Sequence, residues 1–139
     1  MKTVVWTKVY RFCAGHRLHD PGRGDEWNRR VFGKCSYPGG HGHNYTLEVS
    51  VRGEPDAESG LVVREADMDA VIDDVVMKRL DHRNLNDVLS SDFGPAPTTE
   101  VLVLELWRSL DGRIPSPAEL HRVRVSETAK NSFEYMGPT

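Results

Sequence analysis

The amino-acid sequence predicts an α+β fold, in which an antiparallel sheet carries two helices on one of its faces. Two observations indicate this class. Apolar and polar residues alternate in stretches near the beginning, the middle and the end of the chain, as they do in half-buried strands. Between the middle and the final stretches, two segments repeat their apolar residues at helical spacing instead. The 139 residues have the length of one ordinary domain, so we expect a single domain over residues 1–139.

The strands are predicted from residue type and from a period of two. The first, residues 3–12 (TVVWTKVYRF), is rich in β-branched and aromatic side chains. Residues 44–53 (NYTLEVSVRG) alternate strictly, with one apolar and one polar face. A short third strand is expected at residues 61–63 (LVV) after a turn. Residues 121–128 and 132–135 alternate again and are predicted to close the chain as strands.

Two amphipathic helices are predicted between these strands. The first covers about residues 65–79. Its apolar stripe is formed by Met68, Val71, Ile72, Val75 and Val76. The second helix follows Pro97, where the hydroxyl group of Thr98 or Thr99 can cap the first turn and Glu100 interacts favourably with the helix dipole. Its apolar stripe is formed by Val103, Leu106, Trp107 and Leu110.

The composition argues against several classes of function. A net charge of -3 and a pI near 6.1 leave no basic excess for nucleic-acid phosphates, although a local basic cluster could hold a small phosphorylated ligand. The sequence contains no run of about 18 apolar residues that would cross a membrane, and its first residues do not resemble a signal peptide. We therefore expect a cytoplasmic protein in which Cys13 and Cys35 are reduced rather than paired.

The connection between the first two strands holds the most unusual residues of the chain. Residues 19–40 are polar and rich in glycine, and a connection of this length in a compact domain is often functional. It runs into FGKCSYPGGHGHNY, residues 32–45, which contains one of the two cysteines and two of the six histidines. A turn needs the glycines and the proline of this stretch, but it needs neither a thiol nor imidazoles.

Three histidines form the predicted metal site. His41 and His43 lie two residues apart in an extended chain, so their side chains point to the same side. If the first two strands pair antiparallel, His16 at the end of the first strand lies beside them. Three histidines and an open position are the ligand set of a catalytic zinc site, whereas structural zinc normally has four protein ligands. A histidine at a strand end can also be an ordinary polar residue, and we interpret His19 and His121 as surface residues.

The two cysteines are predicted to have different roles. Cys35 could be a fourth metal ligand, a nucleophile, a base or a buried apolar residue. Its neighbours Lys34, Ser36 and Pro38 argue against burial, and a thiolate is favoured near a cation or an imidazole. Cys13 lies within the first strand, where we expect a small, packed side chain.

Two further polar groups have an ordinary and a functional interpretation. Asp81 and His82 follow the first helix, either as its terminal residues or as an acid–base pair in which the carboxylate orients the imidazole. Glu127 lies at the end of a strand, where a glutamate is usually solvated. Its carboxylate could also accept two parallel hydrogen bonds from the guanidine-like edge of a heterocycle.

Five motifs occur along the chain in the order of a known family. They are FCAGHRL, FGKCSYPGGHGHNY, LDHRNLN, PTTEVLVLELW and VSET. Together they resemble 6-pyruvoyl tetrahydropterin synthase, from about Val5 to Tyr135. The HGHNY block with its upstream cysteine is the most specific of these motifs.

The resemblance implies a T-fold, which is a four-stranded antiparallel sheet with two helices on one face. It also implies that three subunits close a twelve-stranded barrel and that two trimers stack into a homohexamer, with active sites between subunits. Closing the barrel would cover the exposed edges of each sheet.

The same resemblance implies roles for single residues. The three histidines of the predicted metal site are the zinc ligands. Cys35 is the catalytic cysteine, and Asp81 and His82 complete its triad from a neighbouring subunit. Glu127 anchors the pterin. The segment beside the pterin ring consists of Thr98, Thr99 and Glu100.

The implied reaction converts 7,8-dihydroneopterin triphosphate to 6-pyruvoyl-tetrahydropterin with loss of triphosphate. Zinc acts on the two side-chain hydroxyl oxygens as a Lewis acid. Cys35 as thiolate removes the neighbouring protons, and His82 relays them. The oxidation of the side chain accompanies the reduction of the ring, so no external redox cofactor is needed. Mg2+ assists through the triphosphate, for which Arg17 and Lys34 are candidate partners.

Related activities are the alternatives. The spacing C-x5-H-G-H, from Cys35 to His41, is similar to that of the pyruvoyl enzyme of tetrahydrobiopterin synthesis, whereas 6-carboxy-tetrahydropterin synthase of queuosine biosynthesis typically has C-x3-H-G-H. A relative from folate synthesis carries glutamate in place of the cysteine. A pterin-binding zinc module without catalysis would be expected to lose the thiol or the pair Asp81 and His82, and all three residues are present.

Overall fold

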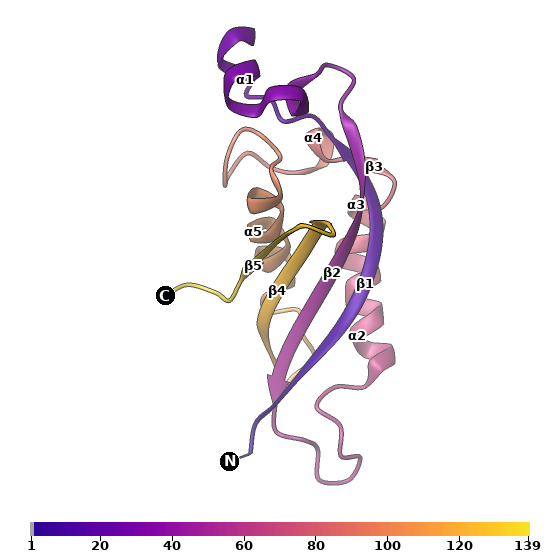
Figure 1. The fold of residues 1–139 in the computed structure, drawn as a ribbon. Coiled ribbons are helices and arrows are strands. Elements are labelled where there is room, and N and C mark those ends of the chain that lie inside the picture. Colours follow the sequence, from indigo (N-terminus) through magenta and orange to yellow (C-terminus); the bar gives the residue numbers. More distant parts are fainter. Residues whose placement is uncertain (1) are drawn as a thin grey trace.

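The computed structural model describes residues 2–139, and one mixed sheet runs through it. Figure 1 shows two long strands that extend over most of the length of the molecule. The spatial order of the strands is β3-β1-β2-β4-β5. Their bounds are β1 Val4–His16, β2 His41–Gly53, β3 Arg83–Asn84, β4 Glu119–Thr128 and β5 Asn131–Tyr135.

The sheet confirms the α+β class and corrects two details of the prediction. It has five strands rather than four, because the two-residue strand β3 pairs in parallel with Ala14 and Gly15 of β1. All other neighbouring strands pair antiparallel. The strand predicted at residues 61–63 is absent. The carbonyl of Leu61 accepts a hydrogen bond from the backbone N–H of Asp56, so this segment closes its own loop instead of joining the sheet.

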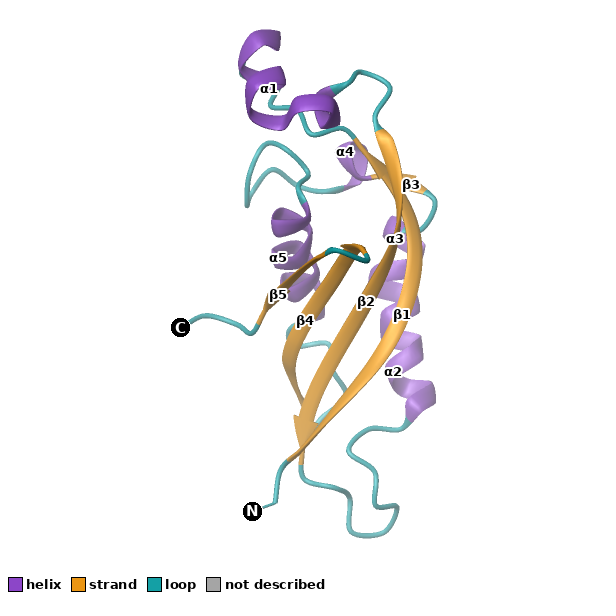
Figure 2. Ribbon diagram, in the orientation of Figure 1, coloured by secondary structure: helices purple, strands orange, loops and turns teal. Residues whose placement is uncertain are grey.

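Two long helical segments cover one face of the sheet, as the sequence predicts (Figure 2). The first is continuous from Glu65 to Leu80 and agrees closely with the predicted range. The second is α5 (Thr99–Leu110), and the hydroxyl of Thr98 accepts a hydrogen bond from the backbone N–H of Val101 at 3.1 Å, so Thr98 is its cap. The parts of the first segment are α2 Glu65–Ile72, the π-helical turn η2 Asp73–Met77 and α3 Lys78–Leu80.

Short helices occupy the connections. The long connection after β1 contains α1 (Asp25–Phe32) and the 3-10 turn η1 (Gly33–Ser36), which the sequence did not predict. The buried side chain of Asn28 donates to the carbonyl oxygens of Asp20 and Gly24, and this bonding folds the polar segment into a compact unit. Helix α4 covers Leu85–Val88. Within residues 2–139 no helix combines the length and the apolar character that crossing a membrane requires.

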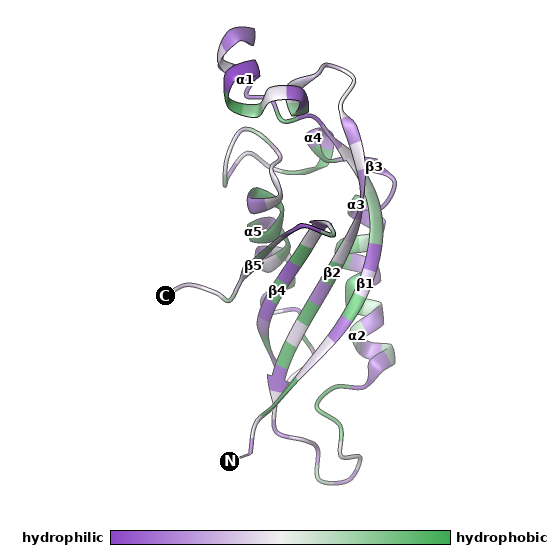
Figure 3. Cartoon of the chain, viewed as in Figure 1, coloured by the Kyte–Doolittle hydropathy of each residue, from purple (hydrophilic) through white to green (hydrophobic). Residues whose placement is uncertain are grey.

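The core lies between the sheet and the two long helical segments. Hydropathy alternates along β2 and β4 in Figure 3, and the apolar positions are those that face the helices. Leu47, near the middle of β2, is fully buried. It packs within a cluster to which β2 contributes Tyr45, Val49 and Val51, α2 contributes Met68 and Ile72, and α5 contributes Leu102, Leu106 and Leu110.

This core leads to a prediction about stability. Leu47→Ala removes a side chain that is 0% exposed, so it should lower the free energy of unfolding by about 2–5 kcal/mol. Leu61→Ala makes the same change at a residue that is 48% exposed, and its effect should stay within about 0.5 kcal/mol. Urea unfolding of both variants at one protein concentration measures the difference. Equal destabilisation by the two substitutions would contradict this description of the core.

A three-histidine centre at the end of the paired strands

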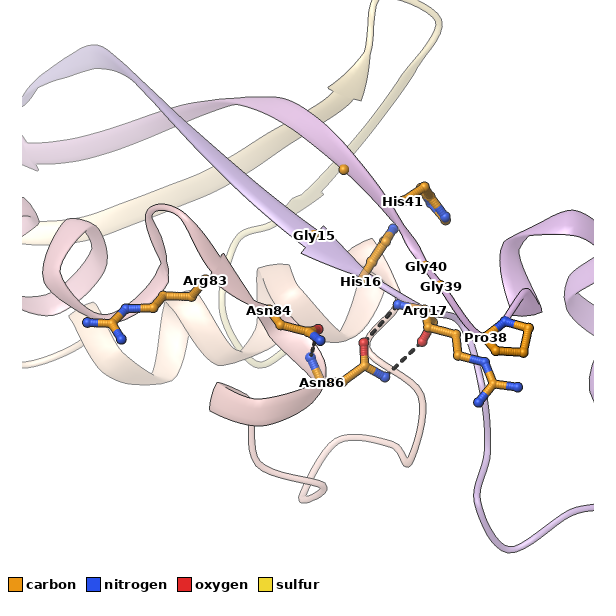
Figure 4. A pocket seen from close by; sticks show the side chains of 11 residues that line it. Gly15, His16, Arg17, Pro38, Gly39, Gly40, His41, Arg83, Asn84 and Asn86 are labelled. Carbon is orange, nitrogen blue, oxygen red and sulfur yellow. Dashed lines mark hydrogen bonds between the residues drawn. The ribbon is translucent and has the colours of Figure 1, made fainter.

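The pairing of β1 with β2 builds the centre of the candidate site. In the antiparallel register His16 lies opposite His41, and Ala14 lies opposite His43. One ring nitrogen from each of the three histidines lies within 4.8 Å of those of the other two. The structure therefore brings together the three residues predicted as metal ligands, and Figure 4 shows two of them, His16 and His41, among the residues that line a cavity.

The hydrogen bonding of His16 is typical of a histidine that binds a metal ion. Its Nδ1 lies 2.8 Å from the carbonyl oxygen of Pro97, and because a carbonyl only accepts, Nδ1 carries the proton. Its Nε2 is buried and has no hydrogen-bond partner among the described residues. A buried acceptor without a partner is costly, and a metal ion at this position would satisfy it.

Burial favours the neutral form of two of these imidazoles, those of His16 and His43. Burial lowers the pKa of His16 below its ordinary value of 6.5, and the nearby His41 and His43 lower it further, against the opposing effects of the Pro97 carbonyl and Glu127. Burial also lowers the pKa of His43. A neutral imidazole is the form that binds a metal ion, so the donor set fits zinc.

Glu127 lies at the same centre. Its Oε1 is 3.3 Å from Nε2 of His43 and 3.6 Å from Nε2 of His16. Since Nε2 of neutral His16 is an acceptor, a carboxylate oxygen and a nitrogen lone pair face one another without a proton between them. This arrangement favours a cation or a hydrogen-bond donor of a ligand at this point.

Two buried hydroxyl groups near the three-histidine centre make no hydrogen bond with the described residues. The hydroxyls of Tyr45 and Thr99 are buried and make no hydrogen bond among the described residues. The ring of Tyr45 lies 5.5 Å from that of His43, and burial raises the pKa of its hydroxyl. The alternation of β2 predicted Tyr45 only as a core residue. Its position in HGHNY, two residues after the second ligand on the same face, was the available signal for a place beside the metal centre.

The start of α5 connects the helix to the metal centre. Pro97, just before this helix, supplies the carbonyl that fixes His16. Of the three residues predicted beside the substrate, Thr98 uses its hydroxyl as the helix cap, Thr99 is buried with its hydroxyl free, and Glu100 is exposed. The Thr99 hydroxyl therefore makes no hydrogen bond of its own among the described residues, but it lies beside the Tyr45 hydroxyl and acts to lower the pKa of Tyr45.

Asp81 and His82 form the predicted pair at the end of α3. Nδ1 of His82 lies 3.1 Å from Oδ2 of Asp81. Oδ1 of Asp81 accepts the backbone N–H of Cys13 at 2.9 Å, and the thiol of Cys13 lies in the same cluster. Cys35 is half-buried in η1, and its carbonyl accepts a hydrogen bond from the backbone N–H of Leu18.

The packed role predicted for Cys13 is wrong, because this residue is exposed. Phe12 and Ala14 occupy the buried face of β1, so alternation turns Cys13 to the opposite face. His19 and His121, predicted as surface residues, are half-buried, and the Nδ1 atom of His19 is inaccessible.

A cavity of about 560 Å³ opens beside His16 and His41 (Figure 4). Two arginines, Arg17 and Arg83, belong to its lining, and Nε of Arg17 donates to the carbonyl of Ser36 at 2.8 Å. The Asn86 side chain accepts the backbone N–H of Arg17 at 2.8 Å and donates to its carbonyl at 2.9 Å. Arg83 and Asn86 were not predicted from the sequence as site residues, although both belong to the LDHRNLN motif. Lys34 is not part of this lining.

The fold and the site define an α+β protein with a three-histidine centre at the end of two paired strands. The family model for 6-pyruvoyl tetrahydropterin synthase matches residues 6–138. The chain is 41% identical over 132 residues to a 6-pyruvoyl tetrahydrobiopterin synthase from Drosophila melanogaster, covering 95% of this chain and 79% of the relative. It is 38% identical over 126 residues to that of Homo sapiens, covering 91% and 86%.

A solved structure gives the same result. The Caenorhabditis elegans 6-pyruvoyl tetrahydropterin synthase superposes with a TM-score of 0.90 at 36% identity, covering 99% of this chain and 98% of the other. The chain therefore belongs to the 6-pyruvoyl tetrahydropterin synthase family.

The three-histidine centre predicts that substitution of one of its histidines abolishes metal binding. His43→Ala deletes one of three ligands, so the zinc content should fall from about one ion per chain to a small fraction of that. His121→Ala removes a histidine outside the cluster and should leave the content unchanged. Elemental analysis after dialysis measures both. Full zinc retention in His43→Ala would exclude this ligand assignment.

Proposed function

We propose that this chain catalyses the zinc-dependent conversion of 7,8-dihydroneopterin triphosphate to 6-pyruvoyl-tetrahydropterin with loss of triphosphate. The observation that carries the proposal is the buried, unpartnered Nε2 of His16 beside His41 and His43 in a chain of this family. The names of the relatives from Drosophila melanogaster and Homo sapiens support the same activity.

The three histidines would hold the zinc ion. When bound, the ion supplies Lewis acidity toward the two hydroxyl oxygens of the substrate side chain, which makes the neighbouring C–H groups more acidic. The role of the protein is to keep the ligands neutral and in place. Burial keeps His16 and His43 unprotonated, and the Pro97 carbonyl fixes the tautomer of His16.

Cys35 and His82 would move the protons. Cys35, as thiolate, removes protons from the substrate side chain. Oδ2 of Asp81 lies 3.1 Å from Nδ1 of His82 and would favour a proton on that nitrogen, which leaves Nε2 of the imidazole to take and return a proton. The side chain of the substrate is oxidised while its ring is reduced. The two electrons lost by the side chain are gained by the ring, so no external oxidant or reductant is needed.

The pterin and the triphosphate would occupy neighbouring regions. The carboxylate of Glu127 accepts two hydrogen bonds from the amino-pyrimidine edge of the pterin, and Thr99 offers its free hydroxyl beside the ring. The 560 Å³ cavity with Arg17 and Arg83 is suited to a polyanion, because each guanidinium group can bind phosphate oxygens. Mg2+ would accompany the triphosphate in this cavity.

The proposed working form is a homohexamer in the cytoplasm. β5 is one free edge of the sheet, and β1 is the other edge except where β3 covers Ala14 and Gly15. The exposed Val4, Val5 and Val9 lie along that free part of β1. Closing three sheets into a barrel would pair these edges, and a stack of two such trimers would place active sites between chains.

The proposed chemistry predicts the product of the reaction and a variant that binds zinc but has little activity. Incubation with 7,8-dihydroneopterin triphosphate should give a product with the mass of 6-pyruvoyl-tetrahydropterin, together with inorganic triphosphate. Cys35→Ala should retain zinc and lose roughly 100- to 10,000-fold in turnover, the range of a missing acid–base group. A 6-carboxy product would instead identify the queuosine-type activity. No turnover by the zinc-loaded protein would support a non-catalytic module.

The proposed shared site predicts complementation between variants. If Cys35 and the pair Asp81 and His82 come from different subunits, Cys35→Ala and His82→Ala chains should restore part of the activity when co-expressed. Some sites of a mixed hexamer would then hold both intact groups. Mass spectrometry shows whether the assemblies are mixed. Mixed assemblies without activity would place all three residues of a working site in one chain.

A further inference from the structure

A second group of metal-binding side chains lies on the opposite face of β1 from the histidine centre. One ligand atom from each of Cys13, Asp81 and His82 lies within 4.8 Å of those of the other two, the same spacing as in the three-histidine centre. Two members of the group, Cys13 and His82, line a cavity of about 310 Å³, to which His43 of the histidine centre also contributes. Nothing in the proposed reaction uses the thiol of Cys13.

Backbone hydrogen bonds hold this group together. The N–H of His82 donates to the carbonyl of Cys13 at 2.6 Å, and the N–H of Cys13 donates to Oδ1 of Asp81 at 2.9 Å. The strand and the end of α3 are therefore joined in both directions at the residues that carry the ligand atoms.

His82 is also the one residue other than glycine with a positive φ, at 60°, among residues 2–139. A side chain in this backbone region costs free energy, and such residues persist where the surrounding structure fixes them. Here the two hydrogen bonds to Cys13 supply that constraint. They set the direction in which the imidazole leaves the backbone, toward the thiol and the carboxylate.

From this geometry we propose that Cys13, Asp81 and His82 form a second metal site, for a thiophilic divalent cation of the zinc class. Thiolate, imidazole and carboxylate are all zinc ligands, and three of them leave a fourth position open. Oδ1 of Asp81 accepts one hydrogen bond, and Oδ2 lies 3.1 Å from Nδ1 of His82, so both oxygens retain lone pairs for coordination. Binding would release the proton of the Cys13 thiol, which donates to Oδ1 of Asn44 at 2.8 Å.

The two sites differ in charge and in exposure. The histidine centre has neutral ligands and a buried member, whereas the second site supplies two negative charges and its His82 side chain is 78% exposed. In a single chain the second site is therefore accessible to ions in solution. An ion there would occupy Asp81 and His82, so excess zinc should slow the reaction. That consequence rests on the proposed function, while the site itself does not.

Cobalt distinguishes a thiolate site from an all-histidine site. A thiolate bound to Co2+ gives a near-ultraviolet charge-transfer absorption that nitrogen ligands do not give. The protein as purified, titrated with Co2+, should develop this absorption. Cys35→Ser removes the other thiol and should leave the absorption unchanged, whereas Cys13→Ser should abolish it. Circular dichroism shows whether each variant is folded.

The outcomes separate this proposal from the proposed function. Charge-transfer absorption that persists in folded Cys13→Ser protein, or that is absent from the unsubstituted protein, would overturn the second site. His82→Ala offers an independent test, because it retains the thiol but should reduce the stoichiometry of bound Co2+ by about one ion per chain. A third outcome is that the absorption behaves as expected, but excess Zn2+ inhibits the unsubstituted protein no more than it inhibits the Cys13→Ser variant. That result would support the second metal site and contradict the proposed role of His82 in proton transfer.

Discussion

The antiparallel pairing of β1 with β2 is the constraint on which the rest of the structure depends. It fixes thirteen consecutive pairs, from Val4 opposite Gly53 to His16 opposite His41. A register shift of one residue would turn the side chains of one strand to the other face and separate the three histidines. Gly40 secures the end of the ladder. Its φ is +68°, and a Cβ atom there would lie 2.9 Å from the carbonyl oxygen of His16, so this position requires glycine.

The same pairing links the core to the chemistry. Leu47 and His43 lie on one face of β2, so the face that packs against the helices continues into the face that holds the metal ligands. At that end the carbonyl of Pro97, just before α5, replaces further apolar packing and fixes His16. The packing of α5 on the sheet therefore also orients His16, one of the three predicted metal ligands. A change in the position of α5 would be expected to disturb the metal centre.

Periodicity and local motifs could predict the four longer strands, the two long helical segments and the three histidines, because each depends on residues near one another in sequence. The absent strand at residues 61–63 and the two-residue strand β3 depend on which backbone groups find partners after the chain has folded. The prediction that Cys13 is packed was wrong for a related reason. A small apolar side chain in a strand fits either face, and only the placement of its neighbours shows that this one is exposed and meets the end of α3.

The separation of the two clusters by one strand has a chemical consequence. His16, on the buried face of β1, belongs to a set of three neutral ligands with the Glu127 carboxylate beside it, so the ligands themselves would leave a bound zinc ion its positive charge and hence its Lewis acidity. Cys13, on the other face, lies beside Asp81 and beside His82, the imidazole that would relay protons. If all these groups shared one face, Asp81 and a thiolate would compete to ligate the catalytic ion and would reduce its effect on the substrate. The alternation of β1 places the two clusters on opposite faces of the strand, so their ligands belong to separate groups.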